Sequence, residues 1–297
     1  MNNGLDLTSL FTAMVTPFRG SNVDYDALQE NIVRQAEAGV GGYLFLGSTG
    51  EASTISSEER VEIIRLGVAN NSSNQIMVGT SSSSTAEAVR LTREAADLGA
   101  GFALVSAPAY NKPSQEGIYQ HFVEVAREGG LPVVAYNIPS RTGANITPST
   151  LERIAQLDNI VGVKEASGDM GQIMDVLHRF KDDDFYVFSG DDSLTLPMSV
   201  LGGDGVISVI SNILPEEMVH LVGACQSHDY GEALRHHKYL LPMMQASGLA
   251  GNPASVKYMA ELIGDHSGDC RLPLVGPSID DQKKLKEVVG NYSLFDQ

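Results

Sequence analysis

The sequence alternates short apolar runs with longer stretches of helical periodicity, and it does so repeatedly over most of its length. Eight runs are rich in β-branched and aromatic residues, and turn residues bound each of them. Each run is apolar nearly throughout, which indicates burial on both faces and therefore parallel pairing. The runs are residues 11–17, 42–47, 75–80, 101–107, 131–137, 160–165, 185–191 and 205–211.

The stretches between these runs have the periodicity of amphipathic helices, and several begin at a capping residue. Ser56 is followed by Glu59, and Ser84 by Glu87, which is the spacing of a capping box. Eight strand–helix units in series predict an α/β fold, a (β/α)8 TIM barrel, for which about 250 residues is typical. A doubly wound open sheet is the alternative, but the absence of a glycine-rich dinucleotide turn favours closure.

The pattern becomes wholly helical after Leu214, over residues 215–227, 229–247, 252–264 and 279–292. The first of these helices completes the barrel, and no low-complexity linker separates it from the others. The sequence therefore predicts a (β/α)8 barrel at residues 1–226 and a C-terminal helical extension, packed on the barrel, at residues 227–297.

Charge and composition narrow the range of partners and compartments. With 20 basic and 37 acidic residues the chain carries a net charge of −17, which disfavours nucleic acid and anionic membranes. No apolar run is long enough to span a bilayer, and no signal peptide is evident. The two cysteines, Cys225 and Cys270, are too few for a disulfide framework or a metal knuckle. We expect a cytoplasmic protein without a metal or a cofactor. Residues 235–239, with the adjacent His236 and His237, are expected to form a solvated stretch of a helix.

Lys164 is the most informative residue, because it closes the apolar run 160–165 at the expected mouth of the barrel. A lysine at such a place can simply extend its amine into solvent. An ordinary lysine, with a pKa of about 10.4, is almost fully protonated at pH 7, but desolvation can lower the pKa toward about 7 to 8. A buried amine at the barrel mouth therefore predicts Schiff-base formation with a carbonyl substrate.

Polar residues follow other strand ends. Ser48 and Thr49 lie in GSTGE, a segment that fits an ordinary tight turn but also offers N–H groups and hydroxyls to a carboxylate. Tyr110 follows the fourth run, in the segment SAPAYNKP. Tyr136 ends the fifth run, either as a packing residue or, beside a Schiff-base lysine, as a proton carrier. Arg141 lies in the next loop, either in a surface ion pair or as a clamp on a substrate carboxylate.

Six segments resemble one known family: GSTGE, AYNKPSQEGIYQHF, YNIPSRTG, GVKEASGD, SGDDS and LGGDGVISVISN. In this order, between about Thr12 and Pro273, they resemble the dihydrodipicolinate synthase family of the N-acetylneuraminate lyase superfamily. The resemblance implies a homotetrameric TIM-barrel lyase that needs no cofactor. Its substrates would be pyruvate and L-aspartate 4-semialdehyde, and its product would be 4-hydroxy-tetrahydrodipicolinate, in lysine and diaminopimelate biosynthesis.

The resemblance also implies catalytic roles. Lys164 would form the Schiff base with pyruvate, whose methyl group would then lose a proton to give an enamine that attacks the aldehyde. Tyr136 would donate and accept protons, hydrogen-bonded through Ser48 to Tyr110, which in this family reaches in from the neighbouring subunit.

Substrate-binding roles follow from the same resemblance. Thr49 would bind the pyruvate carboxylate, helped by the backbone around Gly190 and Ile207. Arg141 would hold the carboxylate of the semialdehyde.

Two departures from the family pattern keep alternatives open. The synthases usually have threonine at the position of Ser48, whereas serine is common there in the sialic-acid lyases. The segment around Asn252 also departs from the acidic, proline-rich segment that is usual in the family. A pyruvate-dependent aldolase or lyase acting on a sialic or sugar-derived 2-oxo acid is therefore the alternative, although those lyases lack an arginine like Arg141. A non-catalytic sensor on the same barrel is a third reading, but it would have no use for Lys164.

Regulation by lysine is not expected. Lysine-inhibited members of the family use an aromatic residue just before the tyrosine that Tyr110 matches, and here that residue is Ala109. Arg60 would repel the ammonium groups of the ligand, whereas Glu87 keeps a carboxylate for one of them. A single partly exposed ion pair contributes only about 0–1 kcal/mol, so we expect little affinity for lysine.

Overall fold

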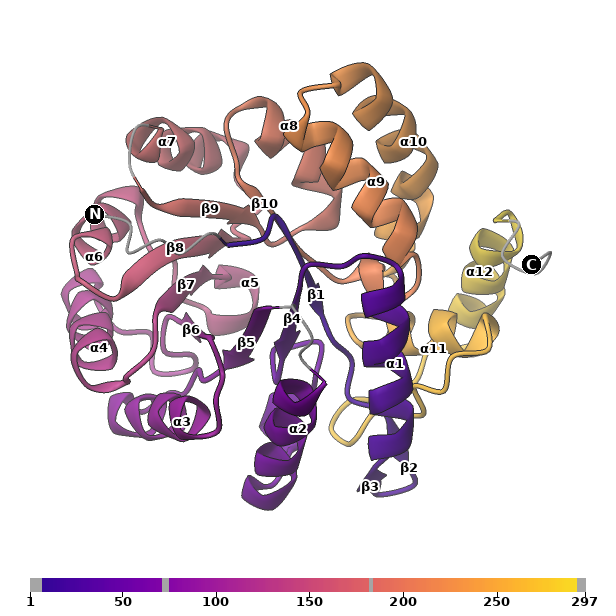
Figure 1. Cartoon of the computed structure of the whole chain (residues 1–297), viewed down its shortest axis with the longest axis horizontal. Coiled ribbons are helices and arrows are strands. Elements are labelled where there is room, and N and C mark those ends of the chain that lie inside the picture. The colour runs from indigo at the N-terminus through magenta and orange to yellow at the C-terminus, as the bar shows by residue number, and fades with distance from the viewer. Residues whose placement is uncertain (1–6, 71–74, 182–183, 293–297) are drawn as a thin grey trace.

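The structure, a computed structural model, describes residues 7–70, 75–181 and 184–292. A closed barrel of parallel strands, in the order β1-β10-β9-β8-β7-β6-β5-β4, lies at its centre, and helices surround it (Figure 1). The predicted (β/α)8 barrel is thus confirmed, and each predicted run overlaps one barrel strand. These strands are β1 (Leu10–Ala13), β4 (Gly42–Phe45), β5 (Gln75–Gly79), β6 (Phe102–Ser106), β7 (Val133–Asn137), β8 (Ile160–Glu165), β9 (Tyr186–Ser189) and β10 (Gly205–Ser208).

Helices follow the barrel strands along the chain and cover the outside of the barrel. The barrel helices are α1 (Tyr25–Glu37), α2 (Ser57–Ala69), α3 (Thr85–Asp97), α4 (Gln115–Glu128), α6 (Pro148–Ala155), α7 (Met170–Phe180), α8 (Thr195–Val200) and α9 (Pro215–Gln226). The C-terminal helices are α10 (Tyr230–Ala246), α11 (Ala254–Leu262) and α12 (Ile279–Gly290). In the described ranges, no helix combines the length and apolarity needed to cross a membrane.

Several short elements were not predicted from the sequence. The β2–β3 hairpin (Phe18–Arg19 and Asn22–Val23) precedes α1, and the short helix α5 (Pro139–Thr142) fills the loop after β7. The described residues also form the 3₁₀ turns η1 (Ala52–Thr54), η2 (Asp192–Leu194) and η3 (Ile210–Asn212). These elements lie in loops, where hydrophobic periodicity carries little signal.

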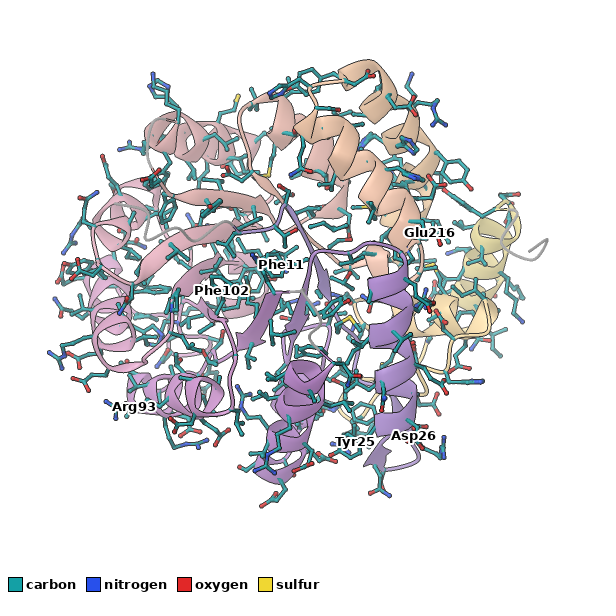
Figure 2. The ribbon with its side chains drawn as sticks, in the orientation of Figure 1. Phe11, Tyr25, Asp26, Arg93, Phe102 and Glu216 are labelled. Carbon is teal, nitrogen blue, oxygen red and sulfur yellow. The ribbon has the colours of Figure 1, made fainter. Side chains whose placement is uncertain are left out.

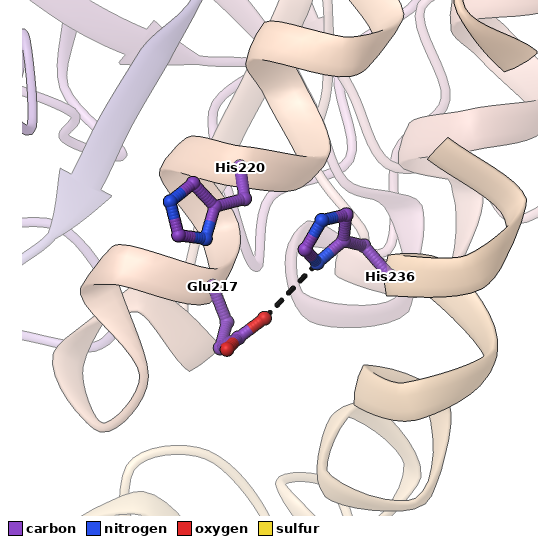
Figure 3. Close-up of side chains that lie close together, drawn as sticks. All are labelled: Glu217, His220 and His236. Atoms are coloured by element: carbon purple, nitrogen blue, oxygen red, sulfur yellow. Dashed lines mark hydrogen bonds and ion pairs between the residues drawn. The ribbon is translucent and has the colours of Figure 1, made fainter. Parts of the chain in front are cut away.

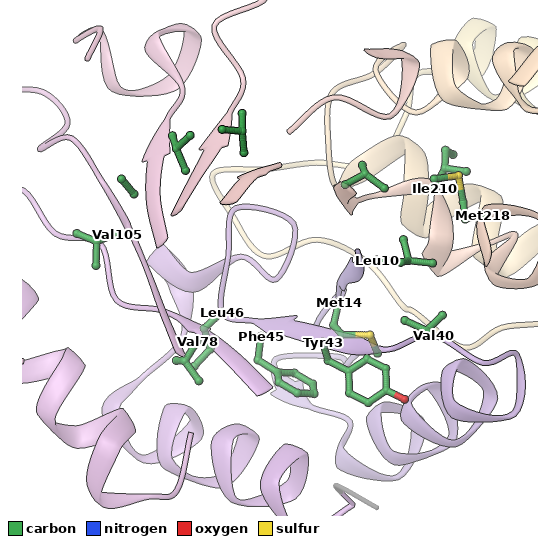
Figure 4. Packing of buried hydrophobic residues seen from close by; sticks show 14 of the residues in the cluster. Leu10, Met14, Val40, Tyr43, Phe45, Leu46, Val78, Val105, Ile210 and Met218 are labelled. Carbon is green, nitrogen blue, oxygen red and sulfur yellow. The ribbon is translucent and has the colours of Figure 1, made fainter. Parts of the chain in front are cut away.

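Side chains that alternate along each strand build two separate apolar layers. Phe11 points into the barrel, where its ring meets that of Phe188 edge-on at 6.0 Å, and Figure 2 shows Phe11 and Phe102 near the centre of the molecule. On β4, Leu44 belongs to the same inner layer, whereas Tyr43 and Phe45 lie on the outer face of the strand, toward the helices (Figure 4). The filled interior is a packed core rather than a pore, so ligands are confined to the barrel ends.

The capping box predicted for α2 is present. The Ser56 hydroxyl accepts a hydrogen bond from the Glu59 N–H at 3.2 Å, and the Ser56 N–H donates to Glu59 Oε2 at 2.9 Å. The box satisfies backbone donors that the first turn leaves without helical partners. It fixes the start of α2, and with it the end of the loop that carries Ser48 and Thr49.

The predicted solvated stretch at residues 235–239 is wrong for His236. Its side chain is buried between α9 and α10, with a residue exposure of 7%. Helical periodicity explains the difference, because His236 lies on the face of α10 that also buries Ala233 and Leu240, three and four residues away.

Candidate active site

A cavity of about 510 Å³ opens beyond the carboxyl ends of the barrel strands. Residues beyond β4, β7, β8 and β9 form its wall, and residues 244–252 close one side. The structure brings six of the predicted site residues to this wall: Ser48, Thr49, Tyr136, Arg141, Lys164 and Gly190. A second cavity of about 400 Å³ shares Ser48, Tyr136 and Arg141 with the first and continues toward Ala109.

Lys164 occupies the buried end of the first cavity. Backbone pairing places it beside Tyr136 on β7, and its Nζ lies 4.8 Å from the centroid of the Tyr136 ring. Burial lowers the pKa of the Lys164 ammonium to about 8, while the attraction of Asp192 opposes this shift and the charge of Arg141 adds to it. With a pKa of about 8, about a tenth of the amines are neutral at pH 7, which gives a usable nucleophile.

Tyr136 is held as a neutral phenol. Burial raises the pKa of its hydroxyl to about 12, against the smaller lowering effects of Arg141 and of a hydrogen bond with Ser48. A phenol that stays protonated can donate to a developing alkoxide or hydroxide, and the Ser48 hydroxyl offers a path for the proton. The lysine amine and the tyrosine hydroxyl therefore lie together with their protonation states suited to carbonyl chemistry.

The substrate-facing side of the cavity is held by contacts between the barrel and residues after α10. The side-chain amide of Asn252 donates to Thr49 Oγ1 at 2.9 Å, and Arg141 Nη2 donates to the carbonyl oxygen of Asn252 at 2.9 Å. Thr49 is buried, yet its own hydroxyl proton remains available to an acceptor in the cavity. Arg141 reaches the same segment, so a positive charge and a hydroxyl face the cavity together.

Gly190 lines the cavity as predicted, but its N–H does not point to a ligand. That N–H donates to the carbonyl oxygen of Glu165 at 2.8 Å, so it is not free for a ligand. A Cβ at residue 190 would lie 2.7 Å from Ala166 Cβ and 3.2 Å from Lys164 Cε. Only glycine therefore leaves space for the lysine side chain at this point.

Ile207 is not among the described residues that line the cavity. Its side chain is fully buried in the barrel interior, in the cluster that also contains Phe11 and Phe188. Val209, two residues further along the chain, lines the cavity instead. The side chain of Ile207 thus supports the floor of the site from below.

Tyr110 lies apart from the other predicted catalytic residues. It is 93% exposed, its φ is +72°, and it lines neither of the two cavities. Its N–H donates to the carbonyl oxygen of Thr142 at 3.3 Å, which ties this loop to the end of α5.

The sequence profile of the dihydrodipicolinate synthetase family matches residues 6–291 of this chain. The chain belongs to this family. The resemblance recognised in the sequence is therefore confirmed over nearly the whole length.

Individual members of the family are similar to this chain from end to end. A 4-hydroxy-tetrahydrodipicolinate synthase of Syntrophus aciditrophicus is 45% identical over 284 residues, which cover 95% of this chain and 97% of the relative. One of Methanospirillum hungatei is 43% identical, with 95% and 98% covered. The crystal structure of dihydrodipicolinate synthase from Aquifex aeolicus superimposes with a TM-score of 0.94 at 39% identity, covering 97% of this chain and 99% of that one.

Asp192 is a residue of the site that the sequence did not predict. Its carboxylate is buried in the cavity wall, and Oδ2 accepts from the N–H groups of Val209 and Ile210 at 2.9 and 3.1 Å. Burial raises the pKa of this carboxyl group, and its charge favours the ammonium form of Lys164. The signal in the sequence was the pair Asp191 and Asp192 just beyond β9, because functional residues of a barrel lie where its strands end.

Proposed function

We propose that this chain condenses pyruvate with L-aspartate 4-semialdehyde, the activity for which its relatives are named. The observation that carries the proposal is the buried amine of Lys164, with its lowered pKa, beside the neutral phenol of Tyr136 in one cavity. Relatives about as long as this chain are named 4-hydroxy-tetrahydrodipicolinate synthase, which supports the same substrates. The sugar-acid lyase alternative is not favoured.

The proposed reaction begins when neutral Lys164 Nζ attacks the keto carbon of pyruvate. Tyr136 protonates the hydroxyl group that leaves as water, and the phenolate so formed removes a proton from the methyl group of the iminium. The resulting enamine carbon attacks the aldehyde, and Tyr136 returns its proton to the new alkoxide. The ammonium group of the bound product then gives a proton to the Tyr136 phenolate. The resulting amine displaces Lys164 from the iminium carbon and closes the ring, which restores the lysine amine and the neutral phenol.

The function is tested by offering the purified chain pyruvate together with L-aspartate 4-semialdehyde and, separately, by offering it N-acetylneuraminate. We expect pyruvate consumption that depends on the semialdehyde, and no pyruvate release from the sialic acid. Arg141 and Lys164 are the only cationic residues among the described lining of the first cavity, which suits a small acidic aldehyde. Cleavage of sialic acid at a comparable rate would overturn the proposal.

Replacing Arg141 by alanine should raise the KM for the semialdehyde by roughly ten- to a hundredfold and change the KM for pyruvate far less. The reason is the loss of a charge-assisted contact with the second carboxylate, worth about 1.5–3 kcal/mol. Steady-state kinetics with each substrate varied in turn give the two constants. The matched control is Arg153→Ala, which removes an exposed arginine paired with Glu116 outside the cavity. Equal increases in both constants would assign Arg141 a structural role.

The proposed assembly is a homotetramer in which Tyr110 completes the site of a neighbouring subunit. Its exposure in the single chain supports this arrangement, because a buried tyrosine could not reach across a boundary. We also propose a cytoplasmic location and a division of the chain into a barrel at residues 1–226 and a helical extension at residues 227–297. Thr49 keeps its proposed part in holding the pyruvate carboxylate, without the Gly190 N–H, which is already bonded to the carbonyl oxygen of Glu165.

Millimolar L-lysine should leave the rate almost unchanged. The second cavity, where Ala109 and Arg60 lie, offers no aromatic ring at residue 109 for the ligand to pack on. Glu87 already pairs with Arg90, with Oε1 and Nη2 2.8 Å apart, so its charge is partly neutralised. Initial rates measured across a lysine titration check this, and saturable inhibition would contradict it.

A further inference from the structure

Two histidines and a glutamate meet on the side of the molecule where α9 packs against α10. Glu217 and His220 lie three residues apart on α9, and His236 faces them from α10 (Figure 3). One ligand atom from each side chain can be chosen so that all lie within 4.8 Å of one another. The reaction proposed above uses none of these residues.

The spacing of one pair of ligand atoms is already close to that of a metal site. Bonds of about 2.1 Å to zinc place tetrahedral ligand atoms about 3.4 Å apart. His236 Nδ1 and Glu217 Oε2 are 3.0 Å apart, and the rings of His220 and His236 have centroids 5.4 Å apart. His220 is exposed, so a change of its rotamer can bring its nitrogen nearer without disturbing the core.

The surroundings of His236 suit both the metal-free and the metal-bound state. Without a metal, Nδ1–H donates to Glu217, and Nε2 accepts from Arg235 Nη2 at 3.0 Å. With a metal on Nδ1 the proton moves to Nε2, and Glu232 Oε1 lies 3.1 Å away as an acceptor. Arg235 Nη2 then has to give up its contact with Nε2, because a guanidinium can only donate. A carboxylate behind the ligating imidazole is the usual partner that fixes the tautomer of a zinc-bound histidine. Arg235 also pairs with Glu232 and so orients that carboxylate.

We propose that Glu217, His220 and His236 bind a Zn²⁺ ion, with Glu232 orienting His236. Two imidazoles and one carboxylate form a ligand set that zinc accepts, with the fourth position left to water. Mg²⁺ prefers oxygen ligands and should not compete. The net charge of −17 favours a cation in general, whereas the pairing of Arg235 with Glu232 limits the positive charge next to the site.

The ion would link the last helix of the barrel to the first helix of the C-terminal extension. α9 ends at Gln226 and α10 begins at Tyr230, so the site bridges the proposed boundary between the two parts. Sequence spacing does not predict the site, because the third ligand comes from another helix and the sequence predicts a solvated His236. A ligand that binds only the folded chain raises its stability by mass action.

The test uses chelator-treated full-length protein, titrated with zinc chloride by calorimetry and melted with and without the ion. We expect one Zn²⁺ per chain and a rise in Tm of about 5 °C at a concentration of 100 Kd. His220→Ala, a change at an exposed position, should weaken zinc binding at least tenfold and remove the Tm shift. Glu217→Gln should do the same, and magnesium chloride should give neither heat nor shift.

The matched control is His178→Ala, which removes an exposed histidine from α7 and should bind zinc like the unchanged protein. Glu232→Gln should weaken zinc binding less than His220→Ala does, because Glu232 contacts His236 and not the metal ion. Zinc binding that survives His220→Ala, or that is lost instead in Cys270→Ser, would overturn the proposal. So would a titration without saturable binding.

Discussion

Borohydride reduction of the chain in the presence of pyruvate should attach one reduced pyruvyl group to the peptide that carries Lys164. The expectation follows from the position of its amine, which is buried at the closed end of the cavity and has a pKa of about 8. Only the neutral amine attacks a carbonyl, so the rate of labelling should increase as pH rises toward about 8 and level off above it. Mass spectrometry of the digested protein locates the label.

Lys164→Ala should abolish this labelling and lower turnover by about 10³-fold or more, because Lys164 is the only lysine in the described lining of the cavity that can form the covalent intermediate. The matched control is Lys283→Ala, which removes an exposed lysine on α12 and should leave both labelling and turnover intact. The circular dichroism spectrum should be the same for both variants. A label on any other lysine, or full turnover by Lys164→Ala, would contradict the Schiff-base mechanism.

The part of the site that could be predicted from sequence is the part set by the barrel itself. Parallel strands place all their carboxyl ends at one edge, so any polar residue at such an end belongs to the same opening. Lys164 and Tyr136 meet for this reason, since they lie side by side on β8 and β7. Ser48 and Thr49 follow from the loop after β4 by the same argument.

The rest depended on side-chain burial and on partners far away in the chain. In the sequence, Asp192 is one of two adjacent aspartates. Its burial and its electrostatic effect on Lys164 show that it belongs to the site. Asn252 reaches Thr49 from the region beyond α10, a contact that no local pattern predicts. Tyr110 is 93% exposed in the single chain, a burial state that its position after a strand does not predict.

The contacts that hold the C-terminal helices on the barrel were equally hidden in the sequence. Glu51 ends the GSTGE segment, and its Oε1 lies 2.6 Å from Nζ of Lys257 on α11, with the two side chains 0% and 2% exposed. Glu51 Oε2 also accepts from the N–H of Arg271 at 2.9 Å, and Lys257 Nζ donates to the carbonyl oxygen of Asp269 at 3.1 Å. Both charges are therefore paired and hydrogen-bonded inside the protein, directly below the loop that carries Ser48.

Lys257→Met should lower the free energy of unfolding by about 3–5 kcal/mol, because it leaves the carboxylate of Glu51 buried without its counter-charge. Urea unfolding followed by circular dichroism gives the change. The double variant Glu51→Gln, Lys257→Met should recover part of the loss, since no unpaired charge then remains. In the exposed pair of Lys283 and Asp280 on α12, where the side chains are 73% and 83% exposed, Lys283→Met should cost no more than about 1 kcal/mol. If Lys257→Met were as mild as this control, the buried pair would not be what holds α11 against the catalytic loop.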